Sequence, residues 1–258
     1  TRTGAFIQGG EAVVIDANAT LSDRELGQDR DNWSGAVLTL QRWDTSGDVA
    51  AANADDLFDG SGNLASLAAA SGTVTLGGID IGSYTQAGGV LAITFSAAAT
   101  TARVDEVLQS LTYANAKTAP GSLADASVSI RVTIDDGNTG DADQGAGGAL
   151  TDTAVISIAI NRLPVLSADT ATVAEGVATT DTTSVAGNVL TDGTADSDPD
   201  SDTITVVGGK AGAATATAAD YTLVAVSSTS ASNAASVSGS YGSLAIGADG
   251  SYVYTVDN

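Results

Sequence analysis

The sequence contains no cysteine and no histidine, and these two absences exclude several kinds of chemistry. Without cysteine there is no disulfide bond and no thiolate nucleophile. Without histidine there is no imidazole base, and the usual zinc ligands are missing. A chain of this kind outside the cell needs another source of rigidity than disulfides, and bound metal ions are one such source.

Aromatic residues are also scarce, at 4% of the chain against 43% for all hydrophobic residues. The core must therefore consist mostly of Val, Leu, Ile and Ala, which favours thin β-sandwiches over a deep enzyme core. A glycosidase with a pair of carboxylates needs neither histidine nor cysteine. Such enzymes usually line their clefts with aromatic rings, whereas this chain has only two Trp and six Tyr. We therefore predict that the protein is not an enzyme.

Basic residues are few, because 9 Lys and Arg face 31 Asp and Glu, for a formal net charge of -22. This balance argues against nucleic acid and anionic membranes as partners. It favours cations, and Ca²⁺ in particular, because calcium takes carboxylate and carbonyl oxygens in flexible geometry. No run reaches the roughly 20 apolar residues that span a bilayer, so no membrane insertion is expected.

Short β-branched or alternating runs dominate the first part of the chain, and turn residues separate them, as in a sandwich. One segment differs, because Val104, Val107, Leu108 and Leu111 have the spacing of one helical face, which predicts a short helix. Residues 63–70 are a weaker helical candidate. The predicted strands of this part are residues 12–15, 36–40, 72–76, 90–95, 126–134 and 154–160, the last two forming a hairpin with a long polar loop.

Pro164 follows the last of these strands, and proline disfavours a continuing strand. We place the domain boundary there, with modules at residues 1–163 and 164–258. The second module repeats the strand pattern, and Asp249-Gly250 predicts a hairpin turn between its last two strands. The fold class predicted is all-β, with tandem immunoglobulin- or cadherin-like sandwiches and one short helix in the first module. The strands expected in the second module are residues 203–207, 221–226, 243–246 and 252–256.

The second module resembles the VCBS repeat of giant bacterial adhesins. The resemblance rests on Gly-Asn-Val-Leu at 187–190, the Asp-rich run at 195–206 and the stretch from Tyr241 to Tyr254. The first module is similar to the cadherin-like, chondroitin-sulfate-proteoglycan-type repeats of the same proteins, through residues 14–23, 108–115 and 135–138. The resemblance implies a secreted, repetitive protein of the bacterial cell surface. It also implies further strands after residue 255, so the second module is expected to be incomplete at its C-terminus.

Acidic residues in both modules are candidate calcium ligands. Asp196, Asp198, Asp200 and Asp202 would crowd one face of an extended strand, but turned around an ion they become ligands. The run is not an EF-hand, because Ser201 and Val207 occupy its glycine and glutamate positions; Glu175 or Asp169 could complete the site. In the first module, Asp16 or Asp23 would meet Asp135 or Asp136. The alternatives are a solvated loop in the second module and ordinary turn chemistry in the first.

These observations favour a calcium-stabilised structural or adhesive module, whose partners are calcium, neighbouring modules or copies of itself, and glycans or other surface ligands. One alternative is a subunit of a self-assembling extracellular filament or surface layer. Another is a carbohydrate-binding module, for which Trp33 beside Asp29 and Asp31 is the candidate aromatic platform. That alternative needs an exposed ring, whereas we expect Trp33 and Trp43 to fill the core or the space between the sheets.

Overall fold

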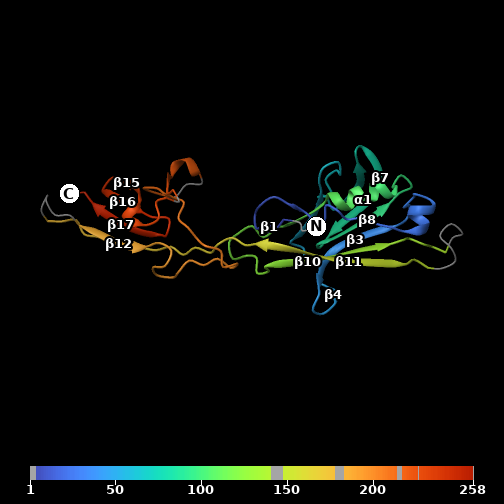
Figure 1. Ribbon diagram of the computed structural model, residues 1–258, viewed down its shortest axis with the longest axis horizontal. Coiled ribbons are helices and arrows are strands. Elements are labelled where there is room, and N and C mark those ends of the chain that lie inside the picture. Colours follow the sequence, from blue (N-terminus) through green and yellow to red (C-terminus); the bar gives the residue numbers. More distant parts are fainter. Residues whose placement is uncertain (1–3, 141–147, 178–182, 214–216, 226, 258) are drawn as a thin grey trace. The chain divides into compact units, whose positions relative to one another are not determined.

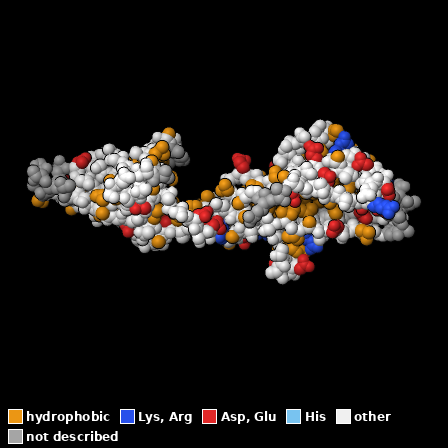
Figure 2. Space-filling view, in the orientation of Figure 1, with side chains coloured by type: hydrophobic (Ala, Val, Ile, Leu, Met, Phe, Trp, Pro, Cys, Tyr) orange, Lys and Arg blue, Asp and Glu red, His pale blue; other side chains and the backbone are white. Residues whose placement is uncertain are grey.

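The computed structural model describes residues 4–140, 148–177, 183–213, 217–225 and 227–257. The fold is mostly β, with one short α-helix among these residues. Contacts divide the chain into two compact units, Thr1–Arg162 and Leu163–Asn258, which we describe separately (Figure 1). On the face seen in Figure 2, acidic side chains are scattered over each unit and basic ones are few.

The first unit is built on a large sheet whose strands alternate buried and exposed residues. In β3, for example, Leu38 and Leu40 are fully buried between half-buried neighbours, as expected for a strand with one face on a core. In spatial order the strands are β1 (Phe6–Ile7), β11 (Thr151–Asn161), β10 (Ser127–Asp135), β3 (Val37–Asp44), β8 (Val90–Phe95), β7 (Ile79–Ala87) and β6 (Ser71–Leu76), with β4 (Val49–Ala50) paired to the end of β3. The predicted hairpin of β10 and β11 is confirmed.

A smaller sheet and the helix complete the first unit. The sheet contains β2 (Val13–Val14), β9 (Leu111–Asn115) and β5 (Asp56–Gly60), in that order. Helix α1 (Thr101–Ser110) buries Val104, Val107 and Leu108, so the predicted helix is confirmed. Leu111, the fourth residue of the helical spacing, instead begins β9 and is also buried. Buried side chains of both sheets and of α1 form one core.

The second helical candidate, residues 63–70, is wrong. The segment is extended and follows the edge of β6, where the N–H of Ala65 donates to the carbonyl of Thr75. The Asp59 carboxylate accepts hydrogen bonds from the Ser66 hydroxyl and the Leu67 N–H. Leu64 and Leu67 are buried as the pattern required, but pairing with the sheet has overridden the helical preference of Ala and Leu.

The second unit has a sheet of β12 (Ser184–Asn188), β17 (Ser251–Val256), β16 (Gly242–Ile246) and β15 (Ala235–Ser238), and a small pair, β13 (Gly208–Gly209) and β14 (Thr222–Leu223). The predicted turn at Asp249-Gly250 is confirmed, with Gly250 at φ 84. The strand predicted at residues 203–207 is wrong, because only isolated bonds form there, such as Val206 N–H to Ala248 carbonyl. The strand predicted at 221–226 is reduced to β14, and Val226 lies outside the described residues.

Candidate cation-binding cleft

An acidic cleft of about 350 Å³ lies in the first unit. One wall comes from residues 20–25, and the other from the end of β10, the turn after it and the start of β11. No Lys or Arg lines it among the described residues. The lining consists of four carboxylates, three hydroxyls, one amide and four apolar side chains: Asp23, Glu25, Asp136, Asp152, Thr20, Ser22, Thr151, Asn138, Leu21, Trp33, Ile134 and Leu150.

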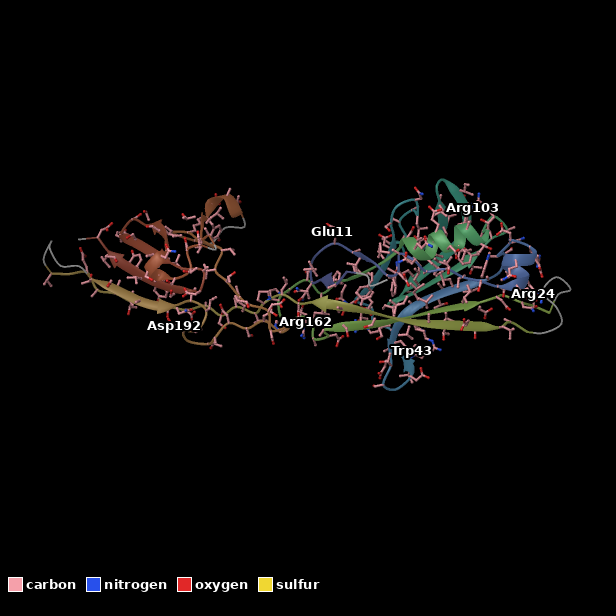
Figure 3. All side chains as sticks on the ribbon, in the orientation of Figure 1. Glu11, Arg24, Trp43, Arg103, Arg162 and Asp192 are labelled. Carbon is pink, nitrogen blue, oxygen red and sulfur yellow. The ribbon has the colours of Figure 1, made fainter. Side chains whose placement is uncertain are left out.

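Asp23 is fixed in the cleft wall by its role as a cap. It precedes a π-helical turn, η1 (Arg24–Asp29), and its Oδ1 accepts the N–H of Leu26 at 2.7 Å. An acidic N-cap satisfies a donor that the turn leaves unpaired. Leu26 is buried, whereas the ion pair Arg24–Asp29 is exposed and neither residue lines the cleft (Figure 3 labels Arg24). Capping therefore holds the Asp23 carboxylate in one place.

Asp136 is fixed by the turn that follows β10. Its Oδ1 accepts the N–H of Asn138 at 2.9 Å and that of Leu150 at 3.0 Å, so one carboxylate ties both ends of the β10–β11 connection. Gly137 has φ 68, and a Cβ there would lie 2.3 Å from the carbonyl oxygen of Gly35. Only glycine fits this close approach without a backbone shift. The Asp136 carboxylate is therefore held in the opposite wall of the cleft by local contacts, as Asp23 is in the first.

Asp152 is a cleft residue that the sequence reasoning missed. In the antiparallel register it lies opposite Ile134, on the face of β11 that also carries Ile156 and Ile158. Asp152 is nevertheless exposed, at the start of β11, so its carboxylate stays in contact with solvent and no burial pattern in the sequence singled it out.

Of the first-module candidates, the structure brings Asp23 and Asp136 into one cleft, together with Glu25. It does not bring Asp16 and Asp135 there. Asp16 accepts the N–H of Asn18 and lies at a neighbouring apolar cavity, while Asp135 accepts the N–H of Gly137. Asp16 and Asp135 thus show the turn chemistry that was the alternative.

The donor chemistry of the cleft suits a hard cation such as Ca²⁺, because every polar lining group offers oxygen. Asp23 and Asp136 both use Oδ1 in the hydrogen bonds given above. Within the described part of the chain, no three acidic side chains converge closely enough to form a metal-binding group by themselves. An ion here would therefore need hydroxyl, carbonyl or water oxygens as well.

The aspartates of the second unit form a turn. Asp198 Oδ1 accepts the N–H groups of Asp200 and Asp202, and Ser201 has φ 64. Asp196 accepts the N–H of Ser167 at 2.7 Å. An isolated bridge between Val165 and Ser197 holds the same two segments together. Asp169 lies instead near Gly193, and Glu175 is exposed.

Trp33 is a core residue, as expected from the sequence, and not the exposed platform that a carbohydrate-binding module would need. It is 2% exposed, and its indole N–H donates to the Thr101 hydroxyl. The apolar ring is needed in the core of a unit that is poor in aromatics. Trp43 lies at the base of the β3–β4 hairpin, with the Arg131 guanidinium 3.9 Å from its ring centroid (Figure 3).

Comparisons with protein-family models, curated proteins and solved structures returned no significant match. Among the described residues, no helix is long and apolar enough to cross a membrane. The evidence on function therefore comes from the residues themselves.

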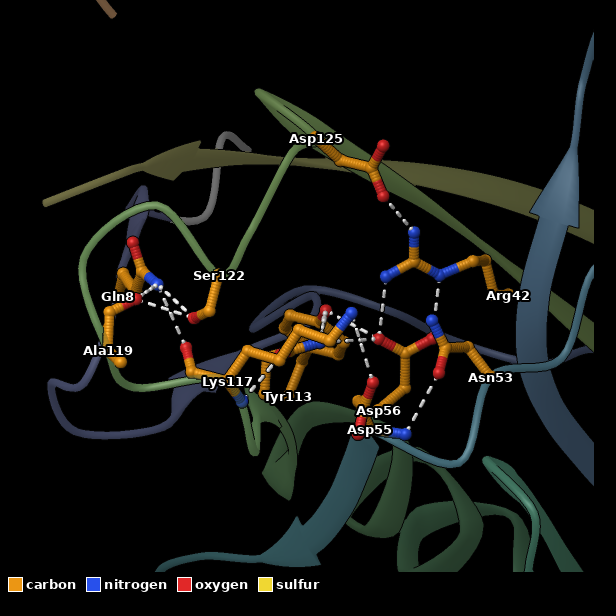
Figure 4. A network of polar contacts seen from close by, with 11 residues as sticks. Gln8, Arg42, Asn53, Asp55, Asp56, Tyr113, Lys117, Ala119, Ser122 and Asp125 are labelled. Carbon is orange, nitrogen blue, oxygen red and sulfur yellow. Dashed lines mark hydrogen bonds and ion pairs between the residues drawn. The ribbon is translucent and has the colours of Figure 1, made fainter. Parts of the chain in front are cut away.

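A buried polar network, which the sequence reasoning also missed, joins the two sheets of the first unit (Figure 4). The Asp56 carboxylate accepts two hydrogen bonds from Arg42, at 2.7 and 2.8 Å, one from the Tyr113 hydroxyl and one from Asn115. The hydrogen bond to Asp56 raises the pKa of Arg42 above its ordinary value. Burial, and then Asp56, raise the pKa of Tyr113. Arg42 and Tyr113 therefore stay protonated, and the network serves structure.

Proposed function

We propose that this chain is a calcium-stabilised structural or adhesive part of a secreted, repetitive bacterial cell-surface protein, made of two β-sandwich modules. The mostly β fold, the net charge of -22 and the absence of cysteine support this proposal. So does the resemblance of the two modules to adhesin repeats. A protein of this kind needs stiffness without disulfides, and ions can provide it.

The observation that carries the proposal is the acidic cleft. It joins carboxylates that are more than a hundred residues apart in the sequence, Asp23 and Glu25 on one wall and Asp136 and Asp152 on the other. Without a cation these charges repel one another across the cleft. A calcium ion held by Asp23 and Asp136 would cross-link the beginning of the first unit to its last hairpin. Because the unfolded chain lacks this arrangement, binding would add directly to stability.

A second ion would act in the same way at Asp196, Asp198 and Asp200. These half-buried residues lie in the turn that contacts Val165 and Ser167 near the start of the second unit. Bound calcium would fix that turn to the first residues of the unit. Binding there would add to the stability of the contacts that Val165 and Ser167 already make with the turn.

The test is thermal unfolding with millimolar calcium and with excess chelator. Both tryptophans lie in the first unit, so their fluorescence reports on that unit alone. Calcium at a hundredfold excess over its dissociation constant should add about 2.7 kcal/mol to the free energy of unfolding. Asp136→Asn keeps an oxygen, now that of the amide, which can accept the N–H groups of Asn138 and Leu150, but it removes the charge, so it should reduce the calcium effect.

Glu11→Gln is the matched control, because it removes one carboxylate from an exposed residue that does not line the cleft (Figure 3). It should leave the calcium effect unchanged. Equal melting temperatures of the unaltered chain in calcium and in chelator would contradict the proposal for the first unit.

The alternative of a self-assembling filament or surface layer is favoured by one observation: in the described part of the first unit, no strand pairs with the outer edge of β11 from Thr151 to Ser157. The alternative of a carbohydrate-binding module has lost its platform, because Trp33 is buried.

A further inference from the structure

Strand β11 leaves most of one edge unpaired. On one side it pairs with β10 along the whole stretch from Thr151 to Ala159. On the other side, β1 pairs with it only at Ile160 and Asn161. Within the described residues, no strand covers the outer edge from Thr151 to Ser157 (Figure 1).

The register shows which backbone groups point outward. Ile160 N–H donates to the Ala126 carbonyl, and Asp136 N–H donates to the Leu150 carbonyl. Residues of β11 with even numbers therefore direct their N–H and C=O toward β10, because the direction alternates along an antiparallel ladder. The residues with odd numbers, Thr151, Thr153, Val155 and Ser157, direct both groups away from the sheet. Of these groups, the N–H of Thr153 donates to Oδ1 of the preceding Asp152 at 2.8 Å, a local hydrogen bond that an added strand would replace.

This edge lacks most of the protection that exposed edges usually carry. Lysine, proline and β-bulges are common protective devices. Residues 153–161 contain no charged residue and no proline, and the pairing with β10 runs without a register shift. The opposite edge of the same sheet is protected, because residues 63–65 bond to β6 and β6 contains a bulge. Among the described residues, two charges lie near the open edge: Asp152 on β11 itself, and Arg131 on β10, whose guanidinium donates to the Thr153 hydroxyl.

An apolar cavity of about 290 Å³ lies beside the open edge. Ala154 and Ile156, which project from the inner face of β11, line one side of it. Ala154 is exposed and Ile156 half-buried, whereas Ile158 further along the same face is fully buried. The core face of β11 is thus left incomplete at this end of the strand. A further strand on the edge would direct alternate side chains toward the same apolar face.

We propose that the outer edge of β11 pairs antiparallel with the same edge of a second copy of this chain. The four residues whose backbone groups point outward lie in pairs on either side of Ala154. A two-fold axis at Ala154 therefore places Thr153 opposite Val155 of the second copy. Thr151 then lies opposite Ser157, and Asp152 lies opposite Ile156. No carboxylate meets another carboxylate within this strand pair, which matters for a chain with a net charge of -22. In the joined sheet, the apolar inner faces of the two β11 strands would form one continuous apolar surface.

The pairing edge shares Thr151 and Asp152 with the lining of the acidic cleft, but strand pairing does not require an ion. A single strand pair buries less surface than the roughly 1,200 Å² of a standard stable interface. We therefore expect reversible association at micromolar concentrations, with a concentration-dependent rise above the 25.2 kDa of one chain. The same rise is expected in chelator, so a failure of calcium binding and a failure of strand pairing can be told apart.

The test is sedimentation equilibrium of the full chain, with charge substitutions at the axis. Ala154→Lys and Ala154→Glu each place two like charges directly opposite one another, and each alone should raise the dissociation constant at least tenfold. Mixing the two variants should restore association, because the charges then attract. Val49→Lys, at a residue of similar exposure to Val155 on β4, is the control and should associate like the unaltered chain.

Val155→Pro is a second variant, because it removes an outward N–H and leaves the bonds to β10 in place. It should also weaken association, with an unchanged tryptophan signal for folding. Monomeric unaltered chain at every concentration would overturn the proposal. So would association that persists unchanged in Ala154→Lys and Val155→Pro, since another surface would then be responsible. A mixture of Ala154→Lys and Ala154→Glu that stays monomeric would exclude pairing at this axis.

Discussion

Replacing Asp56 by alanine should cause a large loss of stability in the first unit. The Asp56 side chain is completely buried, and it accepts four hydrogen bonds from Arg42, Tyr113 and Asn115. Arg42 is itself only 13% exposed, so its charge would stay largely buried after the substitution. Removing one partner of a buried ion pair costs about 3 to 5 kcal/mol.

Asp125→Ala is the control, because Asp125 pairs with the same guanidinium at 2.5 Å but its side chain is 51% exposed. Pairs of this kind contribute about 0 to 1 kcal/mol. Asp56→Asn keeps the volume of the side chain, so a loss equal to that of Asp56→Ala would assign the effect to charge rather than to a cavity.

Denaturant unfolding followed by tryptophan fluorescence measures these differences, because Trp33 and Trp43 both lie in the first unit. The reasoning would be refuted if Asp56→Ala and Asp125→Ala lowered the free energy of unfolding by amounts within about 1 kcal/mol of each other. That result would mean that water or a rearranged side chain replaces the carboxylate without loss.

Two further predictions concern turns. In denaturant unfolding, Gly137→Ala should destabilise the first unit by more than Gly62→Ala. Both glycines have positive φ, but only at Gly137 would a Cβ meet backbone atoms, those of Gly35. Equal losses of unfolding free energy in the two variants would contradict this. The hydroxyl and then the N–H of Ser251 lower the pKa of the exposed Asp249. Because the folded-state pKa is lowered, the hydrogen bonds to the Asp249 carboxylate add to the stability of the fold. This gain in stability is present above the ordinary aspartate pKa near 4 and is lost as the pH falls through the folded-state pKa. In an NMR titration Ser251→Ala should raise the pKa of Asp249, and an unchanged pKa would refute the assignment.

The strands that the sequence predicted well are those where one face is buried against a large core. β8 and β10 alternate apolar and small or polar residues, and their predicted limits differ from the observed ones by no more than one residue. Helix α1 was found by its spacing. In the second unit the fully buried core consists of Val224, Val237 and Ile246, so alternation alone gave a false strand at residues 203–207. Thr and Val at these positions satisfy the pattern without a neighbouring strand to pair with.

The site was predicted only in part, for a related reason. Asp23 and Asp136 were recognisable as turn residues, but their meeting depends on the pairing of distant strands, which local patterns do not specify. Asp152 and Asp56 were missed because each lies in a strand whose partners local patterns do not reveal; Asp152 is exposed at the start of β11, whereas Asp56, one of several acids in its segment, is buried. The register decides on which face such a residue lies. Calcium binding stays a prediction, both at the acidic cleft of the first unit and at the aspartate turn of the second.

The parallel pairing of β1 with β11 has a mechanical consequence. Phe6 lies beside Ile160, and the N–H of Gln8 donates to the Asn161 carbonyl at 2.9 Å. The side chain of Gln8 is buried and donates to the carbonyls of Lys117 and Ala119. Tension that pulls the chain before Phe6 away from the chain after Asn161 would slide the two parallel strands along each other. Their hydrogen bonds would then bear the load together rather than break one after another, so the first unit should resist stretching at the place where the force enters it.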